Sequence, residues 1–232
     1  SKDRRLASQG FTLAEVLIAI AIFALLVSIV MGSFGGVFSH TEALGIQRAN
    51  NAKARSCLMR MATDLGSLYV EQAPFFTPPE MSDPPGIYRF LAGRSSDSIE
   101  ADVLLQFASR AHVDFGDHKQ QGIAVIRYYM EPAGDRDRSL FRLRRYDTVI
   151  YGDDLPEAEG DPILCDNVLS LTFECLDEDG EAVEEWDSAS EARGYATPRA
   201  VRIRLELFAP EGPAVYQTVV ALPLWRQASG KV

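Results

Sequence analysis

The sequence predicts an α+β protein in which one long N-terminal helix packs on a largely antiparallel β-sheet. Three features of the chain lead to this fold class. An apolar block lies near the N-terminus, a segment with a helical period follows it, and the remainder alternates between apolar and polar residues with a period of two. A helix followed by a run of strands is typical of α+β folds.

The apolar block covers residues 11–31, and its only charged residue is Glu15. At about 1.5 Å per residue, a helix of this length spans roughly the 30 Å of a hydrocarbon core, so we predict a transmembrane helix. A secretory signal peptide would have a shorter apolar region, of about 7–15 residues. The small residues that follow the block still leave cleavage there open.

The charges around the block predict how it is oriented. Lys2, Arg4 and Arg5 precede it, and basic residues favour the cytoplasmic side, so we expect the N-terminus in the cytoplasm. The protein as a whole carries a net charge of −10. Because an acidic body repels phosphate, we expect no nucleic-acid partner.

Glu15 lies within the first turns of the predicted transmembrane helix. Burying an ionised carboxylate in lipid costs a few kcal/mol, so such a residue is a functional candidate. The alternative is that Glu15 lies near enough to the interface to remain hydrated. The residue alone does not distinguish the two interpretations.

The helical pattern continues after the apolar block. Gly32, Gly35 and Gly36 form either a hinge or a plain break between segments, because each Gly costs about 1 kcal/mol in a helix relative to Ala. From about residue 41 to 68 the helical period returns. Its apolar positions are Leu44, Leu58, Met61, Ala62 and Leu65. We therefore expect one helix of more than 50 residues whose second half packs on a globular domain.

The prolines between residues 74 and 85 end the helical region, and six strands are predicted beyond them. These strands are residues 99–107, 122–130, 139–146, 167–176, 200–208 and 214–224. In the fifth strand Arg202 and Arg204 alternate with apolar residues and should project from the face opposite the core. They form either a solvated row beside acidic loops or a contact with an acidic neighbour.

Residues with catalytic or metal-binding chemistry form no pattern that we can defend. His112 and His118 lie near Asp114 and Asp117, but their spacing matches no metal-ligand template. The sequence around Asp177, Asp179 and Gly180 fails the twelve-residue calcium-loop frame, although a calcium loop of another kind remains open. We expect no cofactor, no metal site and no enzymatic activity.

The three cysteines do not define a disulfide. Cys165 and Cys175 are ten residues apart on or beside one predicted strand, too far to bond unless that strand bends. Cys57 could pair with either one, and an envelope location would permit it. Buried free thiols are the preferred interpretation.

The N-terminus resembles the processing site of type IV pilins and type II secretion pseudopilins. It has a short basic leader ending in Gly10, then Phe11, then Glu15 as the fifth residue counted from Phe11. The resemblance implies that a prepilin peptidase cuts after Gly10 and methylates Phe11. A carboxylate near a helix N-terminus is favoured by the dipole. Glu15 could then pair with the Phe11 amine of a neighbouring subunit and fix axial register.

The C-terminal half resembles the J-type minor pseudopilin of type II secretion systems. The similar positions are Asp166, Val168, Leu171 and Phe173, then Trp186, then Pro198, Ala200, Val201, Arg202 and Leu205. The implied organisation is a prepilin leader at 1–10, a transmembrane or filament-core helix at 11–31, its continuation at 32–70, and a periplasmic β-rich domain at 71–232.

The same resemblance implies a structural subunit at the pseudopilus tip, needed for assembly and protein export, in the bacterial inner membrane. Its expected partners are the I- and K-type minor pseudopilins, with the H type a further candidate, the major pseudopilin, the prepilin peptidase and the inner-membrane assembly platform. The alternatives are a minor pilin of a type IV pilus or competence filament, and a single-pass envelope enzyme or receptor.

Overall fold

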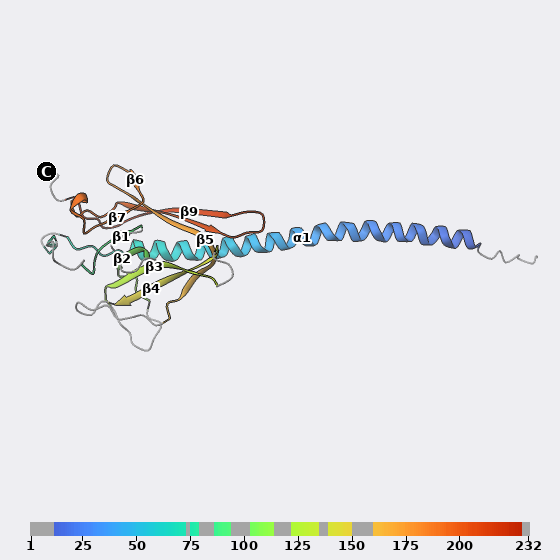
Figure 1. The fold of residues 1–232 in the computed structure, drawn as a ribbon, viewed down its shortest axis with the longest axis horizontal. Helices are drawn as coiled ribbons and strands as arrows, with labels where there is room; N and C mark the ends of the chain where they lie inside the picture. The colour runs from blue at the N-terminus through green and yellow to red at the C-terminus, as the bar shows by residue number, and fades with distance from the viewer. Residues whose placement is uncertain are drawn as a thin grey trace, which may run out of the picture. The chain divides into compact units, whose positions relative to one another are not determined.

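The computed structural model describes most of the chain. The described residues are 12–72, 75–78, 86–93, 103–113, 122–134, 139–149 and 160–228, without the side chains of 33–43. They form one helix, a short 3-10 turn and one antiparallel sheet of nine strands (Figure 1). The predicted α+β class, a long apolar-first helix and a largely antiparallel sheet, is confirmed. The chain divides into two compact units, residues 1–48 and 49–232.

The helix α1 runs without interruption from Leu13 to Gly66 and passes through the glycines at 32, 35 and 36. In the second unit, its residues 49–66 carry the face that the sheet covers. Ala54, Cys57, Met61 and Leu65 lie three or four residues apart and are at most 1% exposed. This spacing places them on one face of a helix.

The predicted packing face of α1 was partly wrong. Met61 and Leu65 are fully buried, whereas Leu58 and Ala62 are only partly covered. Leu44 is 52% exposed and belongs to the first unit, so it is not part of the core. Cys57 lies one residue, about 100° around the helix, from Leu58, and both residues have a helical spacing to Met61 and Leu65, so the spacing alone does not show which of the two is buried.

The sheet is built in the spatial order β7-β1-β2-β3-β4-β5-β8-β9, with β6 paired to β5 as a short branch. All pairs are antiparallel. The strands are β1 (Leu91–Ala92), β2 (Val103–Ser109), β3 (Ala124–Pro132), β4 (Phe141–Val149), β5 (Ile163–Leu176), β6 (Ala182–Val183), β7 (Trp186–Asp187), β8 (Ala200–Leu207) and β9 (Ala214–Ala221), and η1 (Glu191–Arg193) is the 3-10 turn. All six strands expected from the sequence are present, and β1, β6 and β7 were not predicted.

The long strand β5 joins the two halves of the sheet. Its first residues pair with β4, and from Val168 onward it pairs with β8. The register shifts just after Val168, and Asn167 has a φ of 57°. Asn is among the few residues that tolerate this left-handed conformation, and a bulge of this kind bends a strand. Asn167 therefore lies at the irregularity where the pairing of β5 passes from β4 to β8.

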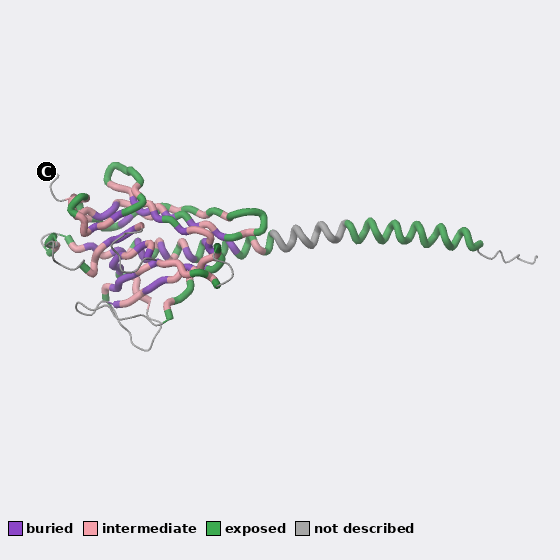
Figure 2. The backbone as a smooth tube through the Cα atoms, in the orientation of Figure 1, coloured by how far each residue is buried: buried purple, intermediate pink, exposed green. Residues whose placement is uncertain are grey.

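One side of the sheet packs on the second half of α1. Fully buried side chains come from the helix and from β2, β3, β4, β5 and β8, and they include Leu105, Phe107, Ile126, Leu143, Ile203 and Leu205. Figure 2 shows this buried core along the strands, while the first half of α1 is exposed along its described length. The fold thus combines a packed domain with a helix that has no apolar cover in this structure.

Candidate assembly site

The start of α1 is closed by a reciprocal pair of side chains. The Thr12 backbone N–H donates to Glu15 Oε2 at 2.9 Å, and the Glu15 backbone N–H donates to Thr12 Oγ1 at 3.3 Å. The Thr12 hydroxyl also donates to Oε2 at 3.0 Å. This is a capping box, in which residues three apart satisfy two backbone donors that a helix leaves unpaired.

Only one oxygen of Glu15 takes part in the cap. Oε2 accepts both bonds from Thr12, and the structure gives Oε1 no hydrogen-bond partner among the described residues. The carboxylate is fully exposed at the end of the helix. One side chain can therefore cap its own helix and still accept a bond from a second molecule. The predicted processing residues Gly10 and Phe11 lie outside the described residues.

The next five turns of α1 are apolar on all sides. Residues 12–32 are exposed throughout, and large side chains such as Leu13 and Phe23 are 82% and 69% exposed. The segment Leu13–Gly32 is long and apolar enough to cross a membrane. A helix that is apolar all round needs lipid or other apolar helices around it. This helix therefore fits both a bilayer and the core of a helical assembly.

At its other end α1 is fixed to the sheet by a buried ionic cluster. Asp64 on α1 and Arg145 on β4 are 0% and 2% exposed. Arg145 donates from Nε to Asp64 Oδ2 at 2.7 Å and from Nη2 to Asp64 Oδ1 at 3.1 Å. Arg60 and the Tyr128 hydroxyl also donate to the Asp64 carboxylate. Planar forks of this kind hold two elements in one register.

A second carboxylate completes the cluster on the sheet side. Arg145 Nη1 donates to Asp147 Oδ2 at 2.5 Å, and the Val113 backbone N–H donates to the same oxygen at 2.9 Å. His112 Nδ1 lies 2.7 Å from Asp147 Oδ1. The arginine is therefore held between two carboxylates, and the cluster also fixes the chain after β2.

The environment raises the pKa values of both Tyr128 and Arg145, but for different reasons. Burial, and then the adjacent Asp64 charge, raise the pKa of the Tyr128 hydroxyl, so the phenol remains a hydrogen-bond donor. Burial alone would lower the pKa of Arg145, but its bonds to Asp64 and Asp147 overcome that effect and raise it. The guanidinium therefore remains charged, which the two carboxylates require.

This ionic cluster was not predicted from the sequence. Its signal was one acidic residue, Asp64, within the apolar spacing of α1, three residues after Met61 and next to Leu65. A charge on a buried helix face needs a partner, which predicts a buried arginine elsewhere. The sequence offers many arginines, so it could not say that the partner is Arg145.

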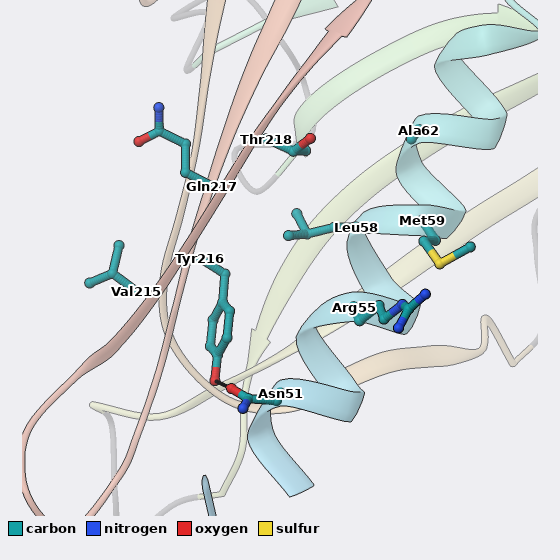
Figure 3. Close-up of a pocket in the computed structure, with 9 residues that line it drawn as sticks. All are labelled: Asn51, Arg55, Leu58, Met59, Ala62, Val215, Tyr216, Gln217 and Thr218. Atoms are coloured by element: carbon teal, nitrogen blue, oxygen red, sulfur yellow. Dashed lines mark hydrogen bonds between the residues drawn. The ribbon is translucent and has the colours of Figure 1, made fainter. Parts of the chain in front are cut away.

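A groove lies between α1 and the edge strand β9, as Figure 3 shows. Its volume is about 510 Å³. Asn51, Arg55, Leu58, Met59 and Ala62 line it from the helix, and Val215, Tyr216, Gln217 and Thr218 line it from the strand. One hydrogen bond crosses the groove, from the Tyr216 hydroxyl to Asn51 Oδ1 at 2.7 Å (Figure 3).

A second pocket, of about 410 Å³, lies where the C-terminal segment meets the loops around β6, β7 and η1. Arg226 donates to the carbonyl oxygens of Tyr195 at 2.6 Å, Ser188 at 2.9 Å and Glu71 at 3.1 Å. Burial lowers the pKa of Arg226 to about 10, against the opposing charge of Glu71. Arg226 therefore fastens three loops together at this pocket.

The other candidates from the sequence have structural roles. Asp177 Oδ1 accepts the backbone N–H groups of Asp179 and Glu181, and Gly180 has a φ of 83°, so this acidic stretch forms the turn between β5 and β6. Arg202 bonds Glu174, and Arg204 bonds Glu206 at 2.8 Å. The arginine row is therefore paired within the chain.

The remaining candidates concern metals and cysteines. Asp114, Asp117 and His118 lie outside the described residues, and the residues that the structure describes include no group of three His, Cys, Asp or Glu side chains placed to hold a metal.

Cys57, Cys165 and Cys175 are buried free thiols, as preferred from the sequence. Burial raises the pKa of both Cys57 and Cys175 to about 12, with the neighbouring Cys165 adding to the shift of Cys57.

The comparisons with known proteins agree with the capped, apolar N-terminal helix. Residues 5–31 match the prokaryotic N-terminal methylation motif, which places the chain in the pilin-like class. Residues 32–216 match the family model of the type II secretion system (T2SS) protein J. Because this match covers most of the chain, the protein belongs to that family and is a J-type minor pseudopilin. No curated protein matches the chain.

Family membership settles the coarse function. The protein is a membrane-anchored type II secretion pseudopilin, a structural class that assembles with other pseudopilin components. The family match disfavours both alternatives, a minor pilin of another filament and a single-pass envelope enzyme or receptor.

Proposed function

We propose that this chain is a structural subunit at the tip of the pseudopilus, needed for pseudopilus assembly and protein export. The observation that carries the proposal is the match to protein J over residues 32–216, joined directly to the methylation motif over 5–31. The chain is stored in the inner membrane with its N-terminus in the cytoplasm and residues 71–232 in the periplasm. The basic residues before the apolar block support this orientation.

Processing prepares the subunit for assembly. The prepilin peptidase removes residues 1–10 after Gly10 and methylates Phe11, and the helix of residues 11–31 then moves from the lipid into the filament core. An apolar helix exposed on all sides supports this step, because lipid and neighbouring helices cover it equally well. The proposed partners at the tip are the I- and K-type minor pseudopilins, with the H type a further candidate there, and the subunit also assembles with the major pseudopilin. The assembly platform drives extrusion.

Glu15 has two functions in this proposal. Its Oε2 caps the helix through Thr12, and its unbonded Oε1 accepts the Phe11 amine of a neighbouring subunit. In a low-dielectric filament core, a subunit out of register would leave a charge unpaired, which costs several kcal/mol. Pairing at Glu15 therefore selects one axial position.

Two substitutions of Glu15 separate capping from charge pairing. Glu15→Gln keeps the capping box, since Gln also serves at this position, but removes the negative charge. Glu15→Ala removes both functions. We expect both variants to enter pseudopili at less than a tenth of the wild-type level, as measured by immunoblotting of sheared filaments. Wild-type incorporation of Glu15→Gln would show that the charge is not needed.

A further inference from the structure

The two edges of the sheet are built differently. At one edge, β7 consists of only Trp186 and Asp187. At the other edge, β9 is eight residues long, and its sequence AVYQTVVA contains no charge and no proline. Proteins usually protect an edge strand by charges, prolines, bulges or shortness, because its free backbone groups pair readily with another chain. Among the described residues, β8 is the only strand that pairs with β9.

The register of β9 shows which backbone groups are free. The Leu222 N–H donates to the Arg199 carbonyl at 2.9 Å, in line with the β8–β9 pairing of Ala200 with Ala221. Hydrogen-bonded positions alternate along an antiparallel pair, so the even-numbered residues of β9 bond β8. The N–H and C=O groups of Val215, Gln217 and Val219 therefore point away from the sheet.

The groove beside β9 is not filled by side chains of the described residues. Tyr216 and Thr218 are only partly covered and lie on the side of the groove, while Val215 and Gln217 point away from the helix (Figure 3). Across the groove, Met59 of α1 is 59% exposed. One more strand beside β9 would project alternate side chains over this part of α1.

Charge restricts which strand fits. Arg55 is the only charged residue that lines the groove, and the structure gives it no ion pair among the described residues. A carboxylate on the incoming strand would complete this site. The β9 strand of a second copy has no carboxylate to offer, so a different segment is required.

We propose that β9 accepts an extended segment of a neighbouring pseudopilin of another type as a tenth strand of the sheet. Apolar side chains at alternate positions of that segment fill the groove above Leu58 and Met59, and a carboxylate pairs with Arg55. Main-chain hydrogen bonds supply affinity in this mode of recognition, and the pockets for alternate side chains supply specificity. The inference rests on the proposed function for the identity of the partner.

Site-specific photo-cross-linking of the full-length chain tests the inference in cells that carry the matching secretion system. A photoreactive residue is placed at Gln217 or Val219 on β9, and at Ile22 on the apolar helix as a report of filament incorporation. We expect positions 217 and 219 to cross-link to residues two apart in one segment of one other pseudopilin. Mass spectrometry of the linked peptides reads this register.

Two variants, each with a matched control, test the contact between β9 and the incoming strand. The measured quantity is the yield of the cross-link from position 219. Gln217→Pro removes the outward backbone N–H of residue 217 without removing a hydrogen bond to β8, whereas Gln217→Ala keeps this N–H. Arg55→Glu reverses the charge in the groove without changing a core residue, whereas Arg55→Lys keeps the positive charge. We expect Gln217→Pro and Arg55→Glu each to lower the yield at least tenfold, and their controls to retain at least half of it.

Three results would overturn the inference. One is cross-linking from Ile22 to other pseudopilins without any from β9, which would leave the proposed function intact. The second is β9-to-β9 cross-linking between two copies. The third is a full yield from both Gln217→Pro and Arg55→Glu. Absence of pseudopilin cross-links from Ile22 as well would overturn the proposed function itself, and with it the partner.

Discussion

Removal of the Asp64 carboxylate should destabilise the protein more than any exposed ion pair does. In Asp64→Ala, the guanidinium of Arg145 loses two hydrogen bonds at a site where Arg145 is only 2% exposed in the wild-type protein. The donors on Arg60 and Tyr128 lose their acceptor as well. Breaking a buried pair from one side costs about 3–5 kcal/mol. For a folded unit of this size that loss lowers Tm by roughly 6–20 °C.

The Lys53–Asp166 pair provides a matched control. It also joins α1 to the sheet, but its side chains are 38% and 51% exposed. Exposed pairs contribute about 0–1 kcal/mol, so Asp166→Ala should change the free energy of unfolding by less than 1 kcal/mol.

The assay is denaturant unfolding of the full-length chain in detergent, followed by the fluorescence of Trp186 and Trp225. A double-mutant cycle isolates the pair. The double variant Asp64→Leu with Arg145→Met removes both charges. We expect its loss in free energy of unfolding to be smaller than the sum of the losses in the two single variants, by about 2 kcal/mol or more. Additive losses would refute the account, and so would a loss in Asp64→Ala no larger than in Asp166→Ala.

Two further predictions concern buried groups away from this cluster. The folded pKa of Cys57 and of Cys175 is about 12, above an unfolded value near 8.5, so the stability from keeping each thiol neutral is complete below about pH 8.5 and is lost as the pH rises toward 12. Each thiol should lower the free energy of unfolding by about 1.4 kcal/mol per pH unit in that window, and an unchanged pH slope in Cys57→Ala would contradict this. Arg226→Ala should cost at least about 3 kcal/mol, because hydrogen bonds to a charged group contribute about 1.5–3 kcal/mol each, three loop carbonyls lose their donor, and water recovers part of the loss at these part-buried groups. Thermal unfolding measures this loss, and Arg226→Lys, which keeps the charge but not the fork, should recover only part of it.

The sequence could predict the fold where one local pattern determines the structure. The alternation of apolar and polar residues predicted strand β8, and a basic leader followed by an apolar block predicted the N-terminal helix. Two-residue strands such as β1 and β7 could not be predicted in this way, because they are too short to show a period. They form only because they pair with neighbouring strands. The place of Leu44 was mistaken because a helical spacing does not show where the covering sheet ends.

The candidate site divides in the same way. Thr12 and Glu15 are three residues apart, so the capping box could have been read from the sequence. Asp64 and Arg145 are 81 residues apart, and only the strand order of the sheet brings them together. The groove beside β9 also depends on which strand ends the sheet, which no local pattern reveals.

Co-purification of the full-length protein with the I- and K-type pseudopilins of the same organism tests the central claim most directly. The three chains would be expressed together, extracted in mild detergent, and separated by size exclusion with light scattering for the mass. The account predicts one stable complex that contains all three chains in equal numbers. Elution of this chain apart from both of the others, under conditions in which those two still associate, would contradict its place at the pseudopilus tip.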